Sequence, residues 1–140
     1  MGSICKRHVV TVEGNASLQH AAALMREHHV GSLVVTASGG DGAQVSGMLT
    51  DRDLAIEVLA RGGDASRATV GSLAHSPLVS VREDESLAAA VAQMQSAGVR
   101  RLLVHNAEGH LVGLVSFDDL LPACIAPLAG LAEVLRRGLE

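Results

Sequence analysis

The chain has 140 residues, of which 48% are hydrophobic, 19% charged and only 1% aromatic, and its formal net charge is −4. This length and composition are typical of a folded protein with an aliphatic core. The negative charge argues against a nucleic-acid binder, which needs a basic face, and no apolar run approaches the roughly 20 residues of a membrane span. We therefore expect a cytoplasmic protein with no nucleic-acid or membrane partner.

The first predicted elements are a strand, a helix, two strands and a second helix. A short β-rich run at 10–12 precedes Ser17, a favourable N-cap for a helix whose apolar residues recur at positions 18, 21, 22 and 25. Two further β-rich runs follow at 33–36 and 45–49. The next helix is predicted to begin at Thr50, because acidic residues occupy its first turn.

The same pattern returns in the second half of the chain. Ser17 matches Ser86 at an offset of 69 positions, and this offset holds through the next two predicted elements. The segment GMLTDRDL at 47–54 matches GLVSFDDL at 113–120 at an offset of 66, so the first copy has three extra residues in a glycine-rich loop at 38–42. Offsets of this kind indicate a duplicated structural unit.

The repeat divides the chain into four expected segments. These are a first repeat at 1–61, a linker at 62–77, a second repeat at 78–122 and a C-terminal helical tail at 123–140. Pro122 and Pro127 are expected to break the chain before a last helix at 128–139. We expect this last helix to cover an exposed face or a dimer partner.

The duplicated β-α-β-β-α unit, with G-x-x-[TS]-x-x-D entering its second helix, resembles the tandem pair of CBS domains known as a Bateman module. REHHVGSLVV at 26–35 and AGVRRLLV at 97–104 are further similar segments. The resemblance covers residues 4–121. It implies an α+β fold in which two repeats are related by a pseudo-twofold axis and pack through their sheets. It also implies a standalone regulatory protein of the bacterial type.

The two G-x-x-[TS]-x-x-D segments have the chemistry of a nucleotide contact. Thr50 and Ser116 each place a hydroxyl and free amides at a helix N-terminus, where a phosphate is favoured. Asp53 and Asp119 follow one helical turn later, where a carboxylate can accept hydrogen bonds from ribose hydroxyls. In the family these positions bind ribose and phosphate. The alternative is that all four residues are ordinary helix caps and helix-start acids.

The resemblance implies further ligand contacts around these segments. Arg100 and Arg101 stand where the family commonly directs a basic side chain to phosphate, whereas the first copy has Gly31 and Ser32. Arg52 is either an additional charge near the first segment or a solvated arginine on the helix surface. The segments that bracket adenine in the family correspond to four residues of this chain: Val10, Thr11, Val79 and Ser80.

We therefore expect a non-enzymatic sensor of AMP, ADP, ATP or S-adenosylmethionine, bound as a regulatory ligand in clefts between the repeats. We also expect a homodimer and an output protein partner of unknown identity. The alternative is a structural dimerisation or interaction module with vestigial clefts. None of the common motifs of hydrolases, metalloproteases or phosphate-binding loops is present.

A third and weaker reading is a redox- or metal-responsive protein that uses Cys5, His8 and the pair His28 and His29. A structural zinc site needs four nitrogen or sulfur ligands, and no second pair completes one in this sequence. The sequence therefore predicts neither a metal site nor a cofactor.

Overall fold

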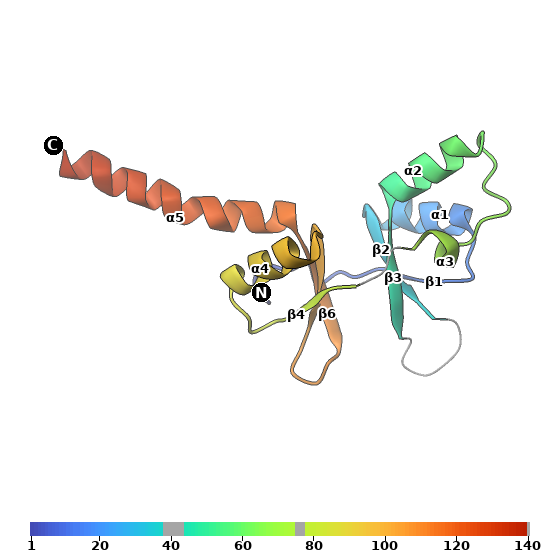
Figure 1. Cartoon of the computed structure of the whole chain (residues 1–140), viewed down its shortest axis with the longest axis horizontal. Coiled ribbons are helices and arrows are strands. Elements are labelled where there is room, and N and C mark those ends of the chain that lie inside the picture. Colours follow the sequence, from blue (N-terminus) through green and yellow to red (C-terminus); the bar gives the residue numbers. More distant parts are fainter. Residues whose placement is uncertain (38–43, 75–77, 140) are drawn as a thin grey trace. The chain divides into compact units, whose positions relative to one another are not determined.

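The structure is a computed structural model that describes residues 1–37, 44–74 and 78–139. The glycine-rich loop expected at 38–42 lies outside these residues. The chain divides into two compact units, one formed by Val9–Leu78 and the other by Met1–His8 together with Val79–Glu140. Each unit contains a three-stranded sheet with helices packed against it, so the predicted α+β class is confirmed (Figure 1).

The first unit follows the predicted order of strand, helix, strand, strand and helix, with one short helix added. Its elements are β1 (Thr11–Glu13), α1 (Leu18–His28), β2 (Ser32–Thr36), β3 (Val45–Thr50), α2 (Asp51–Ala60) and α3 (Val70–Leu73). β1 pairs in parallel with β2, which pairs antiparallel with β3. Ser17 is the N-cap of α1, and its hydroxyl accepts a hydrogen bond from the His20 amide at 3.0 Å.

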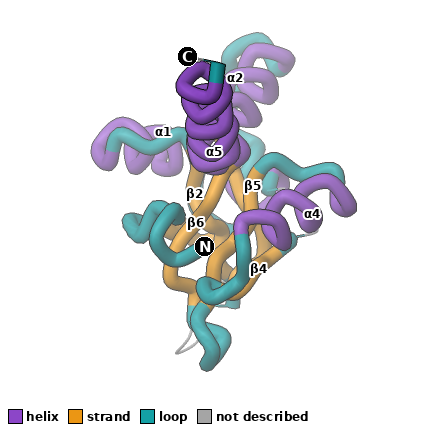
Figure 2. Tube along the Cα trace, turned by 90° about the vertical axis from the view of Figure 1, so that its left-hand side faces the viewer, coloured by secondary structure: helices purple, strands orange, loops and turns teal. Residues whose placement is uncertain are grey.

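The second unit repeats this topology. Its elements are β4 (Ser80–Arg82), α4 (Leu87–Ala97), β5 (Arg101–His105), β6 (Leu111–Ser116) and α5 (Phe117–Gly138). β4 pairs in parallel with β5, which pairs antiparallel with β6. The Ser86 hydroxyl caps α4 by accepting a hydrogen bond from the Ala89 amide at 3.1 Å. Figure 2 shows the strands and helices of both units along a perpendicular direction.

Each unit has its own aliphatic core, as the near-absence of aromatic residues predicts. The first core contains Val12, Leu18, Ala21, Leu33, Val35, Leu49, Leu54 and Val70. The second contains Met1, Val81, Ala90, Leu102, Val104, Val115 and Leu120. Leu18, Ala21 and Met25 of the predicted apolar stripe are therefore buried in the first unit, whereas Ala22 of the same stripe is exposed.

The segments that precede β1 and β4 pack against opposite copies. The Gly2 amide donates to the Glu83 carbonyl at 2.8 Å, and the Gly71 amide donates to the Gly14 carbonyl at 2.7 Å. Met1 is buried in the second core and Val70 in the first. Residues Met1–His8, expected in the first repeat, therefore lie in the unit of the second repeat, and α3, expected in the linker, belongs to the first unit.

The expected break at Pro122 and Pro127 is wrong, because α5 is one continuous helix of 22 residues that contains both prolines. Proline lacks the amide hydrogen that would bond to the carbonyl four residues earlier. Both prolines are exposed, so water can hydrate the carbonyls that they leave without a donor. The helix of the second repeat and the expected tail helix are thus a single element (Figure 1).

Candidate functional site

The turn from β6 into α5 holds Ser116 and Asp119 in a reciprocal capping box. The Asp119 amide donates to the Ser116 hydroxyl oxygen at 3.3 Å, and the Ser116 amide donates to Asp119 Oδ2 at 2.8 Å. The Ser116 hydroxyl also donates to the same Oδ2 at 2.8 Å. These bonds satisfy two helix-start amides and orient the carboxylate, so that its second oxygen, Oδ1, is turned away from Ser116.

Lys6 supplies a positive charge next to that second oxygen. Its Nζ lies 3.4 Å from Asp119 Oδ1, and its backbone exchanges two hydrogen bonds with Leu114 on β6, at 2.8 and 3.0 Å. The close approach requires glycine at position 113, because a Cβ there would lie 2.8 Å from both the Lys6 carbonyl oxygen and Cys5 Sγ. The opening segment of the chain is thereby held against the end of β6.

The Asp119 carboxyl is ionised at neutral pH. Burial acts to raise its pKa, but the hydrogen bonds from Ser116 and the charge of Lys6 outweigh this effect and hold the pKa below its ordinary value. The Asp119 side chain is 17% exposed and that of Lys6 is 74% exposed. The site is therefore an oriented, partly buried anion with a solvent-exposed cation beside it.

The corresponding turn in the first unit, from β3 into α2, has the same cap. The Thr50 amide donates to Asp53 Oδ2 at 2.9 Å, and the Asp53 amide donates to Thr50 Oγ1 at 3.2 Å. Gly31 lies beside this turn, and a Cβ on it would be 3.1 Å from an Asp51 carboxylate oxygen. An acidic side chain therefore lies where the second copy has Arg100.

The other candidate residues lie on strands or immediately before them. Arg101 begins β5 and is the register partner of Ser116 on β6. Val79 accepts a hydrogen bond from the Leu103 amide at 3.0 Å, and Ser80 is the register partner of Leu103. Val10 and Thr11 have the equivalent relationship to β2, where the Val34 amide donates to Val10 at 3.0 Å and Thr11 pairs with Val34.

Arg100 and Arg52 lie beside the starts of α5 and α2. The Arg100 guanidinium lies 5.2 Å from the centre of the Phe117 ring and 4.0 Å from Asp118 Oδ1. The Arg52 side chain is on the exposed surface of α2, and its amide donates to Asp51 Oδ1 at 2.8 Å. Neither guanidinium shares in the hydrogen bonds of the two capping boxes.

Comparison with known proteins assigns the duplicated unit. The family model described as the CBS domain matches residues 1–60 and 70–126. The chain belongs to the CBS-domain family. The CBS domain-containing protein YhcV of Bacillus subtilis is 38% identical over 112 residues, which are 80% of this chain and 76% of YhcV. CBS-domain proteins of this kind are regulatory modules.

Two solved CBS structures share the fold. Hypoxic Response Protein I with two coordinated zinc ions has a TM-score of 0.66 and 35% identity, covering 86% of this chain and 94% of that one. The CBS domain protein PAE2072 from Pyrobaculum aerophilum, complexed with AMP, has a TM-score of 0.69 and 24% identity, covering 84% and 87%. The likeness to PAE2072 is one of fold.

The structure brings together some of the predicted CBS site residues and adds one. Thr50 with Asp53 and Ser116 with Asp119 are confirmed as helix caps, the alternative that the sequence left open; their contact with a ligand stays a prediction. Lys6 was missed, because its position beside Asp119 depends on a backbone pairing distant in sequence. The signal available was the match of MGSI at 1–4 with VGSL at 70–73, which extends the repeat to the opening segment.

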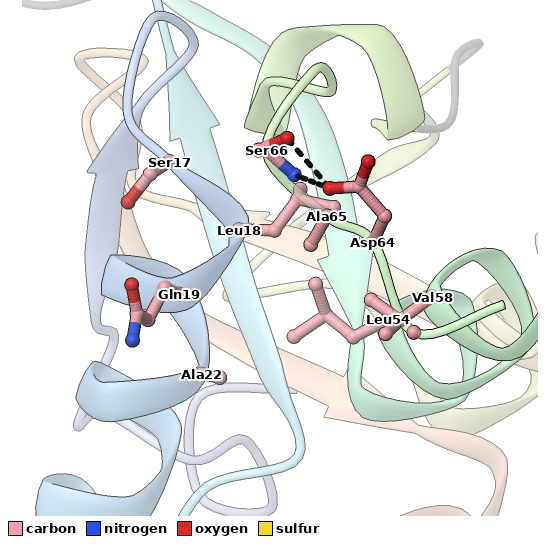
Figure 3. Close-up of a pocket in the computed structure, with 10 residues that line it drawn as sticks. Ser17, Leu18, Gln19, Ala22, Leu54, Val58, Asp64, Ala65 and Ser66 are labelled. Carbon is pink, nitrogen blue, oxygen red and sulfur yellow. Dashed lines mark hydrogen bonds between the residues drawn. The ribbon is translucent and has the colours of Figure 1, made fainter. Parts of the chain in front are cut away.

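A separate pocket of about 480 Å³ lies within the first CBS repeat, between α1, α2 and the segment that follows α2 (Figure 3). Leu18, Leu54 and Val58 form its apolar part. Asp64 lies at its rim and accepts hydrogen bonds from the Ser66 amide at 2.9 Å and the Ser66 hydroxyl at 2.6 Å. The predicted ligand residues do not line this pocket.

Within residues 1–37, 44–74 and 78–139, no three His, Cys, Asp or Glu side chains gather as a metal site would require. Cys5 Sγ lies 3.6 Å from the Gly2 carbonyl oxygen. In the same part of the chain, no helix combines the length and the apolar character needed to cross a bilayer.

Proposed function

We propose that this CBS pair is a regulatory module that senses an adenosine-containing ligand, namely AMP, ADP, ATP or S-adenosylmethionine. The observation that carries the proposal is the oriented, ionised carboxylate of Asp119. Its Oδ2 accepts hydrogen bonds from Ser116, whereas its Oδ1 forms an ion pair with the exposed Lys6. A ribose hydroxyl can donate to Oδ1 without breaking the helix cap.

The charges around the second repeat support an anionic ligand. The turn from β6 into α5 carries three cations, Lys6, Arg100 and Arg101, against two carboxylates, Asp118 and Asp119. In the first repeat the equivalent turn has Asp51 next to Gly31. Since a phosphate is favoured near cations and disfavoured near a carboxylate, we expect the second-repeat site to bind phosphorylated ligands more tightly. The AMP complex of PAE2072 supports this class of ligand.

Such a module regulates by shifting a population of conformations. A ligand favours the arrangement of the chain to which it binds more tightly, and the size of the shift is limited by that difference in affinity. Asp119 and Lys6 come from segments far apart in sequence, so a ligand held by both would tie the opening segment to the start of α5. That coupling would be conveyed to an output protein through surfaces next to these segments.

The test is a titration with AMP, ATP, S-adenosylmethionine and reduced nicotinamide dinucleotide, followed by thermal unfolding. Because the chain has no Trp or Tyr, a dye or circular dichroism must report unfolding. A ligand at about 100 times its dissociation constant stabilises the folded state by roughly 2.7 kcal/mol. For a protein of this size the midpoint should rise by about 10 °C.

Three substitutions make the titration specific. Asp119→Asn keeps an acceptor for the Ser116 amide but removes the charge, and it should reduce the shift to about half or less. Asp118→Asn is the matched control, because it removes an exposed acid from the same helical turn without touching the capping box, and its shift should be at least as large as that of the wild type. Asp53→Asn reports separately on the first repeat. A shift in Asp119→Asn as large as that of the wild type would refute the assignment of this site.

The second candidate is a structural dimerisation or interaction module. The observation that favours it is the exposed apolar surface of α5, where seven large hydrophobic side chains are at least 42% exposed in addition to Leu139 after the helix end. The capping boxes also account for Thr50, Asp53, Ser116 and Asp119 without a ligand. If no ligand changes the melting midpoint of wild-type protein, this second function replaces the first.

A further inference from the structure

The exposed apolar residues of α5 form a stripe along one face of the helix. Leu121, Ile125, Leu128, Leu131 and Leu135, which we call the α5 stripe, are between 42% and 69% exposed. With 3.6 residues per turn they fall within an arc of about 120°. Leu120 is the one described residue of α5 that is buried, so most of the helix has no partner within its own unit.

The positions of the α5 stripe are symmetric about Leu128. Leu121 and Leu135 are equally far from Leu128, and so are Ile125 and Leu131. Just outside the stripe, Phe117 and Leu139 are also equidistant from Leu128, and both are exposed. A twofold interface requires that residue i contact j while j contacts i. Two antiparallel copies of α5 that cross at Leu128 meet this requirement with apolar residues at every level.

The charged residues favour the same orientation. Asp118 lies at the start of α5, 4.0 Å from Arg100, and Arg136 lies in its last turn, 2.7 Å from Glu133. At 3.6 residues per turn these two side chains are on the same flank of the stripe, about 80° from its centre. In an antiparallel pair, the corresponding flanks of the two helices face each other. Asp118 of each copy therefore lies near Arg136 of the other. A parallel pair would place the two copies of Arg136 at the same level.

The area is sufficient for a stable dimer. A fully exposed leucine side chain offers roughly 60 to 120 Å² of apolar surface. The stripe with Phe117 and Leu139 therefore offers on the order of 400 Å² per copy, which is close to the apolar share of the roughly 800 Å² per partner in a standard interface. An unpaired helix with this much contiguous apolar surface is a recognised sign of an interaction site.

A groove next to the first turns of α5 extends the same surface. It has a volume of about 290 Å³ and lies between α4 and α5, with Val91, Phe117, Leu121 and Cys124 among its lining residues. Its lining is apolar, and Phe117 and Leu121 belong to the N-terminal end of the surface just described. In the antiparallel arrangement, Leu135 and Leu139 of the other copy lie next to this end of the helix.

We propose that α5 is a self-recognition helix, which pairs antiparallel with α5 of a second copy about Leu128 and seats its C-terminal leucines at the α4–α5 groove. The proposal is independent of ligand binding at Asp119. It gives the homodimer expected from the sequence a specific surface, and it assigns a role to the helix that continues through both prolines. A dimer made through other helices would leave the α5 stripe in water.

The first test measures the mass of the protein in solution by sedimentation or light scattering. Wild-type protein should be a dimer, and Leu128→Glu should raise the dimer dissociation constant at least 100-fold. Val134→Glu is the matched control: Val134 is 67% exposed on the same helix but lies off the stripe, so this variant should remain dimeric. Circular dichroism establishes that both variants are folded. A monomeric wild type, or a dimer unaffected by Leu128→Glu, overturns the proposal.

The second test fixes orientation by disulfide cross-linking in a background lacking Cys5 and Cys124. Leu128→Cys should cross-link to itself, and Leu121→Cys should cross-link to Leu135→Cys when the two variants are mixed. Leu135→Cys alone should not, because its two copies would lie about 21 Å apart along the helix axis, well beyond the roughly 7 Å limit between the Cα atoms of a disulfide. Efficient cross-linking of Leu135→Cys alone would show a parallel pair and overturn the antiparallel assignment.

Discussion

Replacing Gly113 with alanine tests how tightly the opening segment is held against β6. The added Cβ would lie 2.8 Å from the Lys6 carbonyl oxygen and 2.8 Å from Cys5 Sγ. Both distances are below any normal carbon contact, so the Lys6 backbone must move. That backbone is held by the two hydrogen bonds with Leu114, and it carries the cation that pairs with Asp119.

The expected cost follows from these contacts. Overpacking at a well-packed position costs typically 1–3 kcal/mol, and weakening the bonds to Leu114 adds up to about 1 kcal/mol for each. The loss of glycine's freedom in the unfolded chain offsets about 0.4–1 kcal/mol. We therefore expect Gly113→Ala to lower the free energy of unfolding by about 2 kcal/mol.

Urea denaturation followed by circular dichroism measures this change, and the slope of the transition should stay constant. Gly130→Ala is the matched control, because nothing lies within 4 Å of a Cβ at this helical position. It should stabilise the protein by about 0.5–1 kcal/mol. Adding Cys5→Ala to Gly113→Ala should recover part of the loss, since it removes one of the two obstacles. A Gly113→Ala protein as stable as the wild type would refute the close approach of Lys6.

Three further predictions concern the turn from β6 into α5. Ser116→Ala removes the N-cap hydroxyl and should cost about 1 kcal/mol in urea denaturation, while a cost below about 0.3 kcal/mol would show that the capping box contributes little. The depressed pKa of Asp119 adds stability that is present above the unfolded pKa of about 3.9 and lost as the pH falls through the lower folded value. Asp119→Asn should therefore lose less stability below about pH 4 than the wild type does, and an equal loss in the two proteins would contradict this assignment. Lys6→Ala should cost less than about 1 kcal/mol at low salt, because the side chain is exposed; a loss that persists at high salt would indicate a role other than the ion pair.

The repeated elements could be predicted from the sequence because their signals are local. Ser17 and Ser86 were expected as N-caps, and each accepts the predicted hydrogen bond. The apolar spacing likewise predicted the buried residues Leu18, Ala21 and Met25 of α1, but it was wrong for Ala22, which is exposed. Thr50 and Ser116 were correctly placed at the starts of helices for the same reason.

The remaining features depend on contacts that leave no local pattern. The exchange of the segments before β1 and β4 joins Gly2 to Glu83 and Gly71 to Gly14, and no periodicity near Gly2 indicates which copy it will contact. Lys6 was missed for this reason. The continuity of α5 was missed for another: proline inside a helix is normally a strong stop signal, and its cost is reduced here because the affected carbonyls are near solvent.

Calorimetric titration with AMP tests the central claim most directly, because it reports affinity and stoichiometry for the wild type, Asp119→Asn and Asp118→Asn under the same conditions. Ligand sensing at the second repeat predicts saturable binding to the wild type and to Asp118→Asn, and at least a tenfold weaker binding to Asp119→Asn. Equal affinity for all three proteins would contradict the assignment of Asp119 as the ribose ligand. No heat of binding for AMP, ATP or S-adenosylmethionine, with no shift in the melting midpoint, would contradict the sensor function itself.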